Sequence, residues 1–160
     1  MMDDNEGSMQ TSDMLDIAVG RILADTPQRA KELVDKIDSY YVEEAYGSWR
    51  NNVITIADDV DLSWETILQE TLDETQKTVT AAKPAFNFTK IYADAYVQES
   101  TAGGERYPSV NKAIFDAIEV GAVVVNYFGH GGEDGLARER IFDKINAQDL
   151  KNPCKLNCFV

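Results

Sequence analysis

The apolar run AVVVNY, residues 122–127, restricts the fold of this chain more than any other feature. Apart from Asn126, its side chains are apolar on both faces, which is typical of a strand in the middle of a parallel sheet. The segment before it, residues 109–121, has the apolar spacing of an amphipathic helix and ends in glycine. Parallel strands need such a crossover. The run therefore predicts a parallel sheet with helices on both faces.

The rest of the chain repeats this alternation of short apolar runs and helical segments. We expect strands within residues 15–23, 53–56, 89–92 and 155–160, and helices over residues 25–44, 61–79 and 136–150. Residues 97–108 are expected to form a loop, and residues 1–13 an acidic, irregular start. The chain has 160 residues, which fits one domain over residues 14–160. The order of elements predicts an α/β sandwich with a mostly parallel sheet.

Charge and hydrophobicity exclude two classes of interaction. Asp and Glu number 28 against 15 Lys and Arg, a formal charge of −13 that repels the phosphate backbone of nucleic acids. No apolar run approaches the roughly 20 residues of a membrane helix. The start, MMDDNEGSMQTSD, lacks the basic and apolar regions of a secretory signal. Carboxylates are the ligands that calcium prefers, so a structural calcium ion fits this composition, and no other cofactor is expected.

The strand at residues 122–127 leads into the loop FGHGGEDG, which holds the only histidine of the chain, His130. A phosphate-binding loop is disfavoured, because Asp134 stands where the dinucleotide motif has its third glycine, and the lysine of a P-loop is absent. A histidine that only packs beside the strand is the ordinary alternative. The third alternative is a catalytic base, with glycines that admit a substrate and offer amides to an oxyanion.

Four stretches of the chain resemble the gingipain family of cysteine peptidases. They are IAVGRI, WRNNVITIADD, SVNKAIFDAIEVGAVVVNYFGHGG and LNCFV, which follow the family's order over residues 13–160. The most specific of them is the apolar run that ends in His-Gly. The resemblance implies a caspase-like three-layer α/β sandwich. It also implies a cysteine nucleophile at the end of the strand next to the histidine.

The same resemblance assigns roles to residues of the glycine loop. His130 is the catalytic base and acid, and the Gly131 amide is a donor to the oxyanion. Glu133 and Asp134 stand at the rim of the substrate site, where they favour basic or polar groups.

Two acidic residues compete for the role of orienting the histidine. In the family, this acid follows the strand that matches VITIADD, so Asp58 or Asp59 takes the role. An equally good interpretation is that both belong to a helix cap or, with Asp61, to a calcium-binding loop.

The nucleophile departs from the family pattern, which places the cysteine after a second apolar block. Here that block is LNCFV, residues 156–160, with Cys158 inside it and Cys154 before it. We therefore expect the nucleophile a few residues beyond Val160, and a truncated domain that is inactive by itself. Cys158 as the nucleophile is one alternative. A pseudo-peptidase or binding module that uses the same acidic sheet edge is another.

Two stretches, DDNEG and GHGGEDGLARERIF, are closer to one branch of the family than to the digestive gingipains. This branch cleaves C-terminal sorting signals in type IX secretion. It implies secreted polypeptides with such signals as substrates, and a location at the cell surface or outer membrane, or secretion. The remainder of the parent chain is a further expected partner.

Overall fold

The computed structural model describes residues 20–160. The acidic start predicted for residues 1–13, and most of the strand predicted for residues 15–23, lie outside this range. The chain divides into two compact units, residues 1–37 and 38–160. Helix α1 (Pro27–Asp38) lies within the helix predicted for residues 25–44 but ends six residues before the predicted end. At its start, the backbone N–H of Arg29 donates to Thr26 Oγ1 at 3.1 Å, which is typical of an N-cap.

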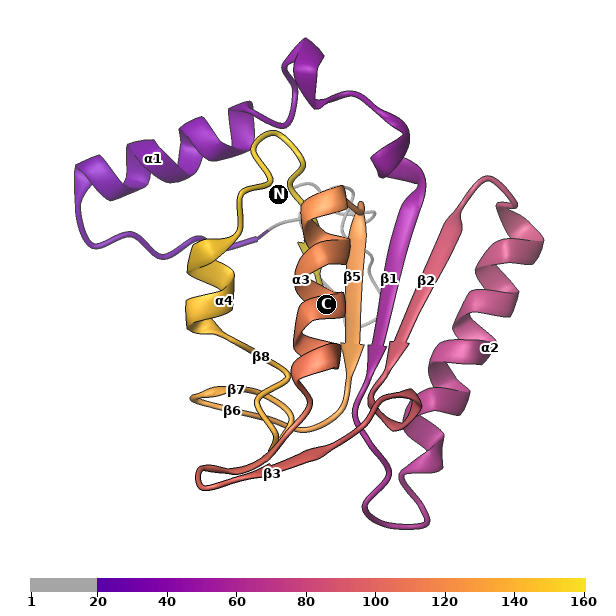
Figure 1. The fold of residues 1–160 in the computed structure, drawn as a ribbon. Coiled ribbons are helices and arrows are strands. Elements are labelled where there is room, and N and C mark those ends of the chain that lie inside the picture. Colours follow the sequence, from indigo (N-terminus) through magenta and orange to yellow (C-terminus); the bar gives the residue numbers. More distant parts are fainter. Residues whose placement is uncertain (1–19) are drawn as a thin grey trace, which may run out of the picture. The chain divides into compact units, whose positions relative to one another are not determined.

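Four parallel strands form the central sheet of the second unit (Figure 1). They are β1 (Asn52–Ala57), β2 (Asn87–Tyr92), β5 (Val124–Phe128) and β9 (Cys158–Phe159), in the order β2-β1-β5-β9. The apolar run at residues 122–127 thus belongs to a central strand, β5. The predicted parallel α/β sheet is confirmed.

Two long helices cover the two faces of this sheet. Ile54 and Ile56 of β1 join one apolar cluster with α3 (Pro108–Val120), which runs alongside β5 in the view of Figure 1. The alternate side chains of β1 are also buried, and α2 (Thr66–Ala82) contacts β1 and β5 through a face that buries Leu68 and Leu72. Because strand side chains alternate between faces, β1 is covered on both sides. None of the helices within residues 20–160 has the length and hydrophobicity to cross a membrane.

Short elements connect these parts. Three 3-10 helices occupy Glu43–Ala45, Ser48–Asn51 and Ala93–Ala95. The segment predicted as a loop over residues 97–108 contains an antiparallel hairpin of β3 (Glu99–Thr101) and β4 (Gly104–Arg106).

The helix predicted for residues 136–150 is wrong over its first half. Part of this segment belongs instead to a small antiparallel sheet of β6 (Gly131–Gly132), β7 (Gly135–Leu136) and β8 (Phe142–Asp143). The short helix α4 (Lys144–Asp149) follows the sheet. A turn with positive φ at Ala137 and Arg140 separates β7 from β8 and places Ile141 in the core. The helix begins only after its N-cap Asp143, whose carboxylate accepts the N–H groups of residues 145 and 146 at 2.8 and 2.9 Å.

Candidate active site

The loops after β1 and β5 meet at the carboxyl edge of the sheet. In the parallel pair, Ala57 lies opposite Phe128, and the N–H of Asp58 donates to Phe128 O at 3.3 Å. Asp58 and His130 therefore leave neighbouring strands at the same edge, where ligands of parallel sheets bind. The sequence places both segments there, and the strand order makes them neighbours.

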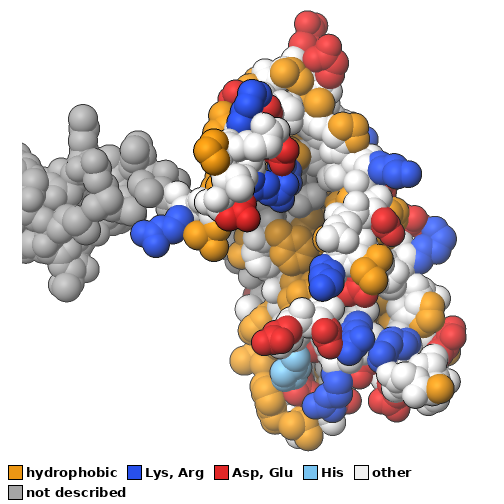
Figure 2. Space-filling model, turned by 90° about the vertical axis from the view of Figure 1, so that its left-hand side faces the viewer, with side chains coloured by type: hydrophobic (Ala, Val, Ile, Leu, Met, Phe, Trp, Pro, Cys, Tyr) orange, Lys and Arg blue, Asp and Glu red, His pale blue; other side chains and the backbone are white. Residues whose placement is uncertain are grey.

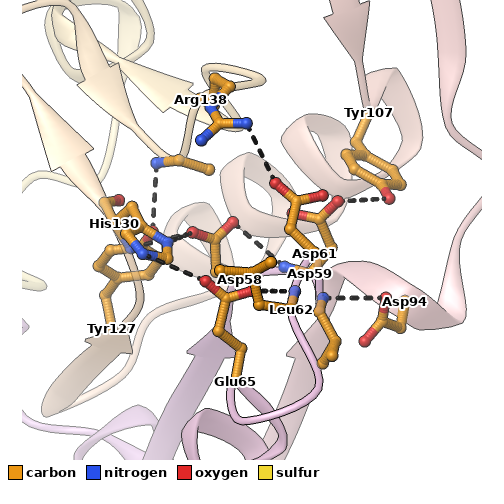
Figure 3. Close-up of polar contacts among 12 residues, drawn as sticks. Asp58, Asp59, Asp61, Leu62, Glu65, Asp94, Tyr107, Tyr127, His130 and Arg138 are labelled. Atoms are coloured by element: carbon orange, nitrogen blue, oxygen red, sulfur yellow. Dashed lines mark hydrogen bonds and ion pairs between the residues drawn. The ribbon is translucent and has the colours of Figure 1, made fainter.

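Asp58 holds His130 through both the ring and the backbone. Its Oδ2 lies 3.0 Å from Nδ1 of the ring and accepts the backbone N–H of His130 at 2.9 Å (Figure 3). Its other oxygen accepts the N–H of Asp59 at 3.1 Å. The side chain of Asp58 is 3% exposed and that of His130 is 57% exposed. Such an arrangement can fix the tautomer and orientation of an imidazole that remains accessible to a reactant.

Asp59 turns away from the histidine. Its carboxylate accepts the hydroxyl of Tyr107 at 3.1 Å, on the other side of the loop (Figure 3). Burial, and then the nearby carboxylate of Glu139, raise the pKa of Asp59 to about 6. Of the two acids that the sequence offers as partners of His130, only Asp58 faces the ring.

Asp58, Asp59 and Glu139 offer oxygens that all lie within 4.8 Å of one another. Carboxylate oxygens are the ligands that calcium takes, so these three residues could hold the expected calcium ion. Asp61 is not part of this group, and its carboxylate pairs with Arg138 at 3.2 Å. The third acid of the group is therefore Glu139, which is buried and follows β7, and not Asp61, which the sequence suggests.

The glycines of the loop differ in their surroundings. A side chain at Gly129 would collide with Asp58 Cβ and with Tyr127. Around Gly132 there is open space, and a Cβ at Gly131 would meet only a backbone oxygen at 3.9 Å. The first glycine is required for packing, whereas the other two leave room beside the histidine.

The amide of Gly131 points away from its neighbouring strand. His130 O accepts the N–H of Ala137 at 2.7 Å, and Gly131 lies opposite Leu136 in the next pair of the β6-β7 ladder. Hydrogen-bonded and non-hydrogen-bonded pairs alternate in an antiparallel ladder, so the Gly131 N–H is directed to the free edge of β6. It is placed to donate to a bound group.

Tyr127 is a part of the site that sequence reasoning missed. Its hydroxyl donates to His130 O and accepts the N–H of Ala137 at 3.1 Å. Burial raises the pKa of Tyr127, and the charge of Asp58 adds to this effect. The hydroxyl therefore ties the histidine loop to β7 as a neutral group. The alternation of strand residues gives no signal for this contact.

Glu133 and Asp134 form the turn between β6 and β7. They line a hollow of about 350 Å³ beside His130, together with Arg138 and Arg140. Asp134 pairs with Arg140 at 2.6 Å, which offsets its charge. Figure 2 shows the histidine, in pale blue, at the surface among acidic and basic side chains. The predicted rim residues lie at the hollow, with a more balanced charge than their sequence suggests.

The two cysteines lie away from His130. Cys158 is exposed and lies opposite Val124, the first residue of β5, and Cys154 precedes it. His130 lies beyond the other end of β5, and the strand from Val124 to Phe128 alone spans about 13 Å. This geometry argues against Cys158 as the partner of His130.

Glu65 is the second residue that the sequence did not reveal. Its carboxylate oxygen Oε1 lies 3.5 Å from Nε2 of His130, and its side chain is 3% exposed (Figure 3). It belongs to the segment predicted as the start of a helix, where nothing distinguishes it from other acidic residues.

Comparison with known proteins agrees with the arrangement of the sheet. A solved structure described as the Arg specific cysteine proteinase gingipain R (RgpB) is similar to this chain, with a TM-score of 0.52 and 19% sequence identity. The match covers 85% of this chain and 29% of that structure's chain, so the chain spans under a third of it. At this identity, the likeness shows the fold.

Sequence comparison identifies the family. No curated protein matches the chain significantly. The family model described as peptidase family C25 matches residues 1–160. The resemblance to gingipains is thereby confirmed, and the chain belongs to peptidase family C25, the gingipain family.

Proposed function

We propose that this chain is the histidine-bearing part of a cysteine peptidase. The observation that supports the proposal most strongly is the contact between the accessible ring of His130 and the buried carboxylate of Asp58, 3.0 Å from Nδ1. A Cys-His peptidase needs an imidazole that is held by a third group and open to the nucleophile.

In the proposed reaction, a cysteine thiolate attacks the scissile carbonyl carbon and forms a tetrahedral oxyanion. The Gly131 N–H, which points to the free edge of β6, donates to that oxyanion. His130 gives a proton to the leaving amine as the peptide bond breaks and a thioester remains. Water then attacks the thioester, loses a proton to His130, and releases the acid and the thiol.

We place the nucleophile on a continuation of β9. This strand runs parallel to β5, and the N–H of Tyr127 donates to Val160 O at 2.9 Å. A chain that continued in this direction would reach the level of His130 about four residues further on. Neither Cys154 nor Cys158 is in such a position.

The substrate in this proposal is a polypeptide. The free edge of β6 and the open space at Gly132 suit an extended backbone, which could pair with the edge as an added strand. Within the family, we assign the chain to the PorU-like branch, which cleaves C-terminal sorting signals from secreted proteins in type IX secretion. This assignment rests on the motifs DDNEG and GHGGEDGLARERIF and implies a parent protein at the cell surface or outer membrane, or one that is secreted.

Extension of the chain tests the proposed function. We expect hydrolysis of a peptide ester by a version extended through the next strand and none by the present 160 residues. The substitution His130→Ala should abolish the activity, and Lys112→Ala, an exposed change on α3, should leave it intact. Activity of the short chain that persists after Cys154→Ala and Cys158→Ala would contradict the missing nucleophile. Peptide binding without hydrolysis by the extended chain would favour a binding module.

A further inference from the structure

The ring of His130 lies between two buried carboxylates (Figure 3). Asp58 is 3.0 Å from Nδ1, and Glu65 is 3.5 Å from Nε2. The side chains of both acids are 3% exposed. Asp58 follows strand β1, whereas Glu65 immediately precedes helix α2, so two separate elements converge on one imidazole.

The turn before α2 fixes the carboxylate of Glu65. The N–H of Leu62 donates to Oε2 at 2.6 Å, and the backbone N–H of Glu65 donates to Leu62 O at 2.8 Å. One carboxylate oxygen thus completes the local turn. The other, Oε1, is the atom that faces the histidine.

The turn before α2 explains the position of only one of the two carboxylate oxygens of Glu65, Oε2. An ionised carboxylate is costly to bury unless it is paired. Within residues 20–160, Glu65 forms no ion pair with a lysine or arginine, and its ion-pair contact is with Nε2 of His130. A residue needed only for the turn could leave Oε1 in water.

We propose that Glu65 is a positioning residue of His130, acting at Nε2 as Asp58 acts at Nδ1. A carboxylate accepts hydrogen bonds and cannot donate them, so the two acids hold the ring from both sides when both of its nitrogens carry protons. That form of the ring is the acid that gives a proton to the leaving amine. This consequence for catalysis rests on the proposed function, whereas the contact itself does not.

The lone histidine makes the contact measurable by NMR. In the ¹⁵N-labelled chain, a long-range ¹H–¹⁵N spectrum shows one imidazole, and its two nitrogens report the tautomer. The substitution Glu65→Gln keeps an oxygen for the Leu62 N–H and removes the charge. We expect it to move the Nε2 resonance, and Glu70→Gln, an exposed change on α2, to leave both nitrogens in place. Unchanged nitrogens in Glu65→Gln would overturn the proposal.

A second variant keeps the test possible if Glu65→Gln does not fold. If circular dichroism shows that Glu65→Gln does not fold, Glu65→Asp is compared, which keeps the charge and shortens the side chain by one methylene. Because the shorter side chain holds its carboxylate farther from the ring, a displacement of the Nε2 resonance in the same direction is expected, and its absence counts against the role of Glu65.

Kinetics of the extended chain test the consequence for catalysis. Loosening a positioned group by about 1 Å can cost roughly 100-fold, so we expect kcat to fall at least about tenfold in Glu65→Gln, with KM nearly constant. A kcat equal to wild type would overturn the positioning role. If the extended wild type has no activity, the proposed function fails, and the NMR comparison alone decides the contact of Glu65 with Nε2.

Discussion

Gly129 joins strand β5 to His130 at a point where no side chain fits. A Cβ there would collide with Asp58 Cβ and with Tyr127, two groups that hold the histidine loop. The position therefore couples the packing of the loop to the geometry of the ring.

The substitution Gly129→Ala should lower the free energy of unfolding by about 1–3 kcal/mol, because the added methyl displaces tightly packed neighbours. Urea unfolding measures this loss. Gly132→Ala is the matched control, since open space surrounds Gly132. Equal stability of the two variants would show that the loop can relax around residue 129.

Asp59 should make stability depend on pH. Burial raises its folded-state pKa from 3.8 to about 6, so the folded chain holds this proton more tightly than the unfolded chain. The stability that the proton provides is complete below about pH 4 and is lost as the pH rises through about 6. Asp59→Asn keeps an acceptor for Tyr107 and should flatten this part of the pH profile.

Urea unfolding between about pH 4 and pH 8 in the presence of a chelator measures the profile. Asp116→Asn, an exposed change on α3, should keep the wild-type slope. An Asp59→Asn profile that matches the wild type would mean that other groups cause the dependence.

At the scale of elements, carboxylates from the loop after β1 lie close to a carboxylate from the turn between β7 and β8. Asp58 and Asp59 come from the first, and Glu139 comes from the second. A cation bound by all three would join the two segments that surround His130.

Calcium should therefore stabilise the chain, by about 2.7 kcal/mol when its free concentration is a hundred times the dissociation constant. Thermal unfolding with added calcium chloride or a chelator measures the effect. Glu139→Gln should abolish the response, and Glu133→Gln, on the exposed β6-β7 turn, should keep it. An undiminished response in Glu139→Gln would place the ion elsewhere.

At the scale of the whole molecule, the chain carries a formal charge of −13. Such a field attracts cations and repels anions, and salt screens it. For the extended chain, kcat/KM should be higher for a cationic peptide ester than for an anionic one at low salt. The difference should shrink as salt is added. A preference that salt does not change would instead indicate a specific contact in the hollow beside His130.

The sequence predicts the central elements well and their surroundings less well. The patterns around β1, β5 and α3 are strong, because buried strands and amphipathic helices impose regular spacing on neighbouring residues. Residues 136–141 are mostly of types that favour helices, but they form the end of a strand and a turn. Packing of Ile141 against the core outweighs their local helical preference there.

By itself, the sequence determined the parallel α/β sheet, the place of His130 at its carboxyl edge and the membership of the gingipain family. Only the tertiary structure decided which acids meet the histidine. It selected Asp58 over Asp59, and it brought Glu65 to the ring and Glu139 to the aspartates. These contacts join residues far apart in a chain with 28 acidic side chains, and local patterns carry no information about such distant neighbours.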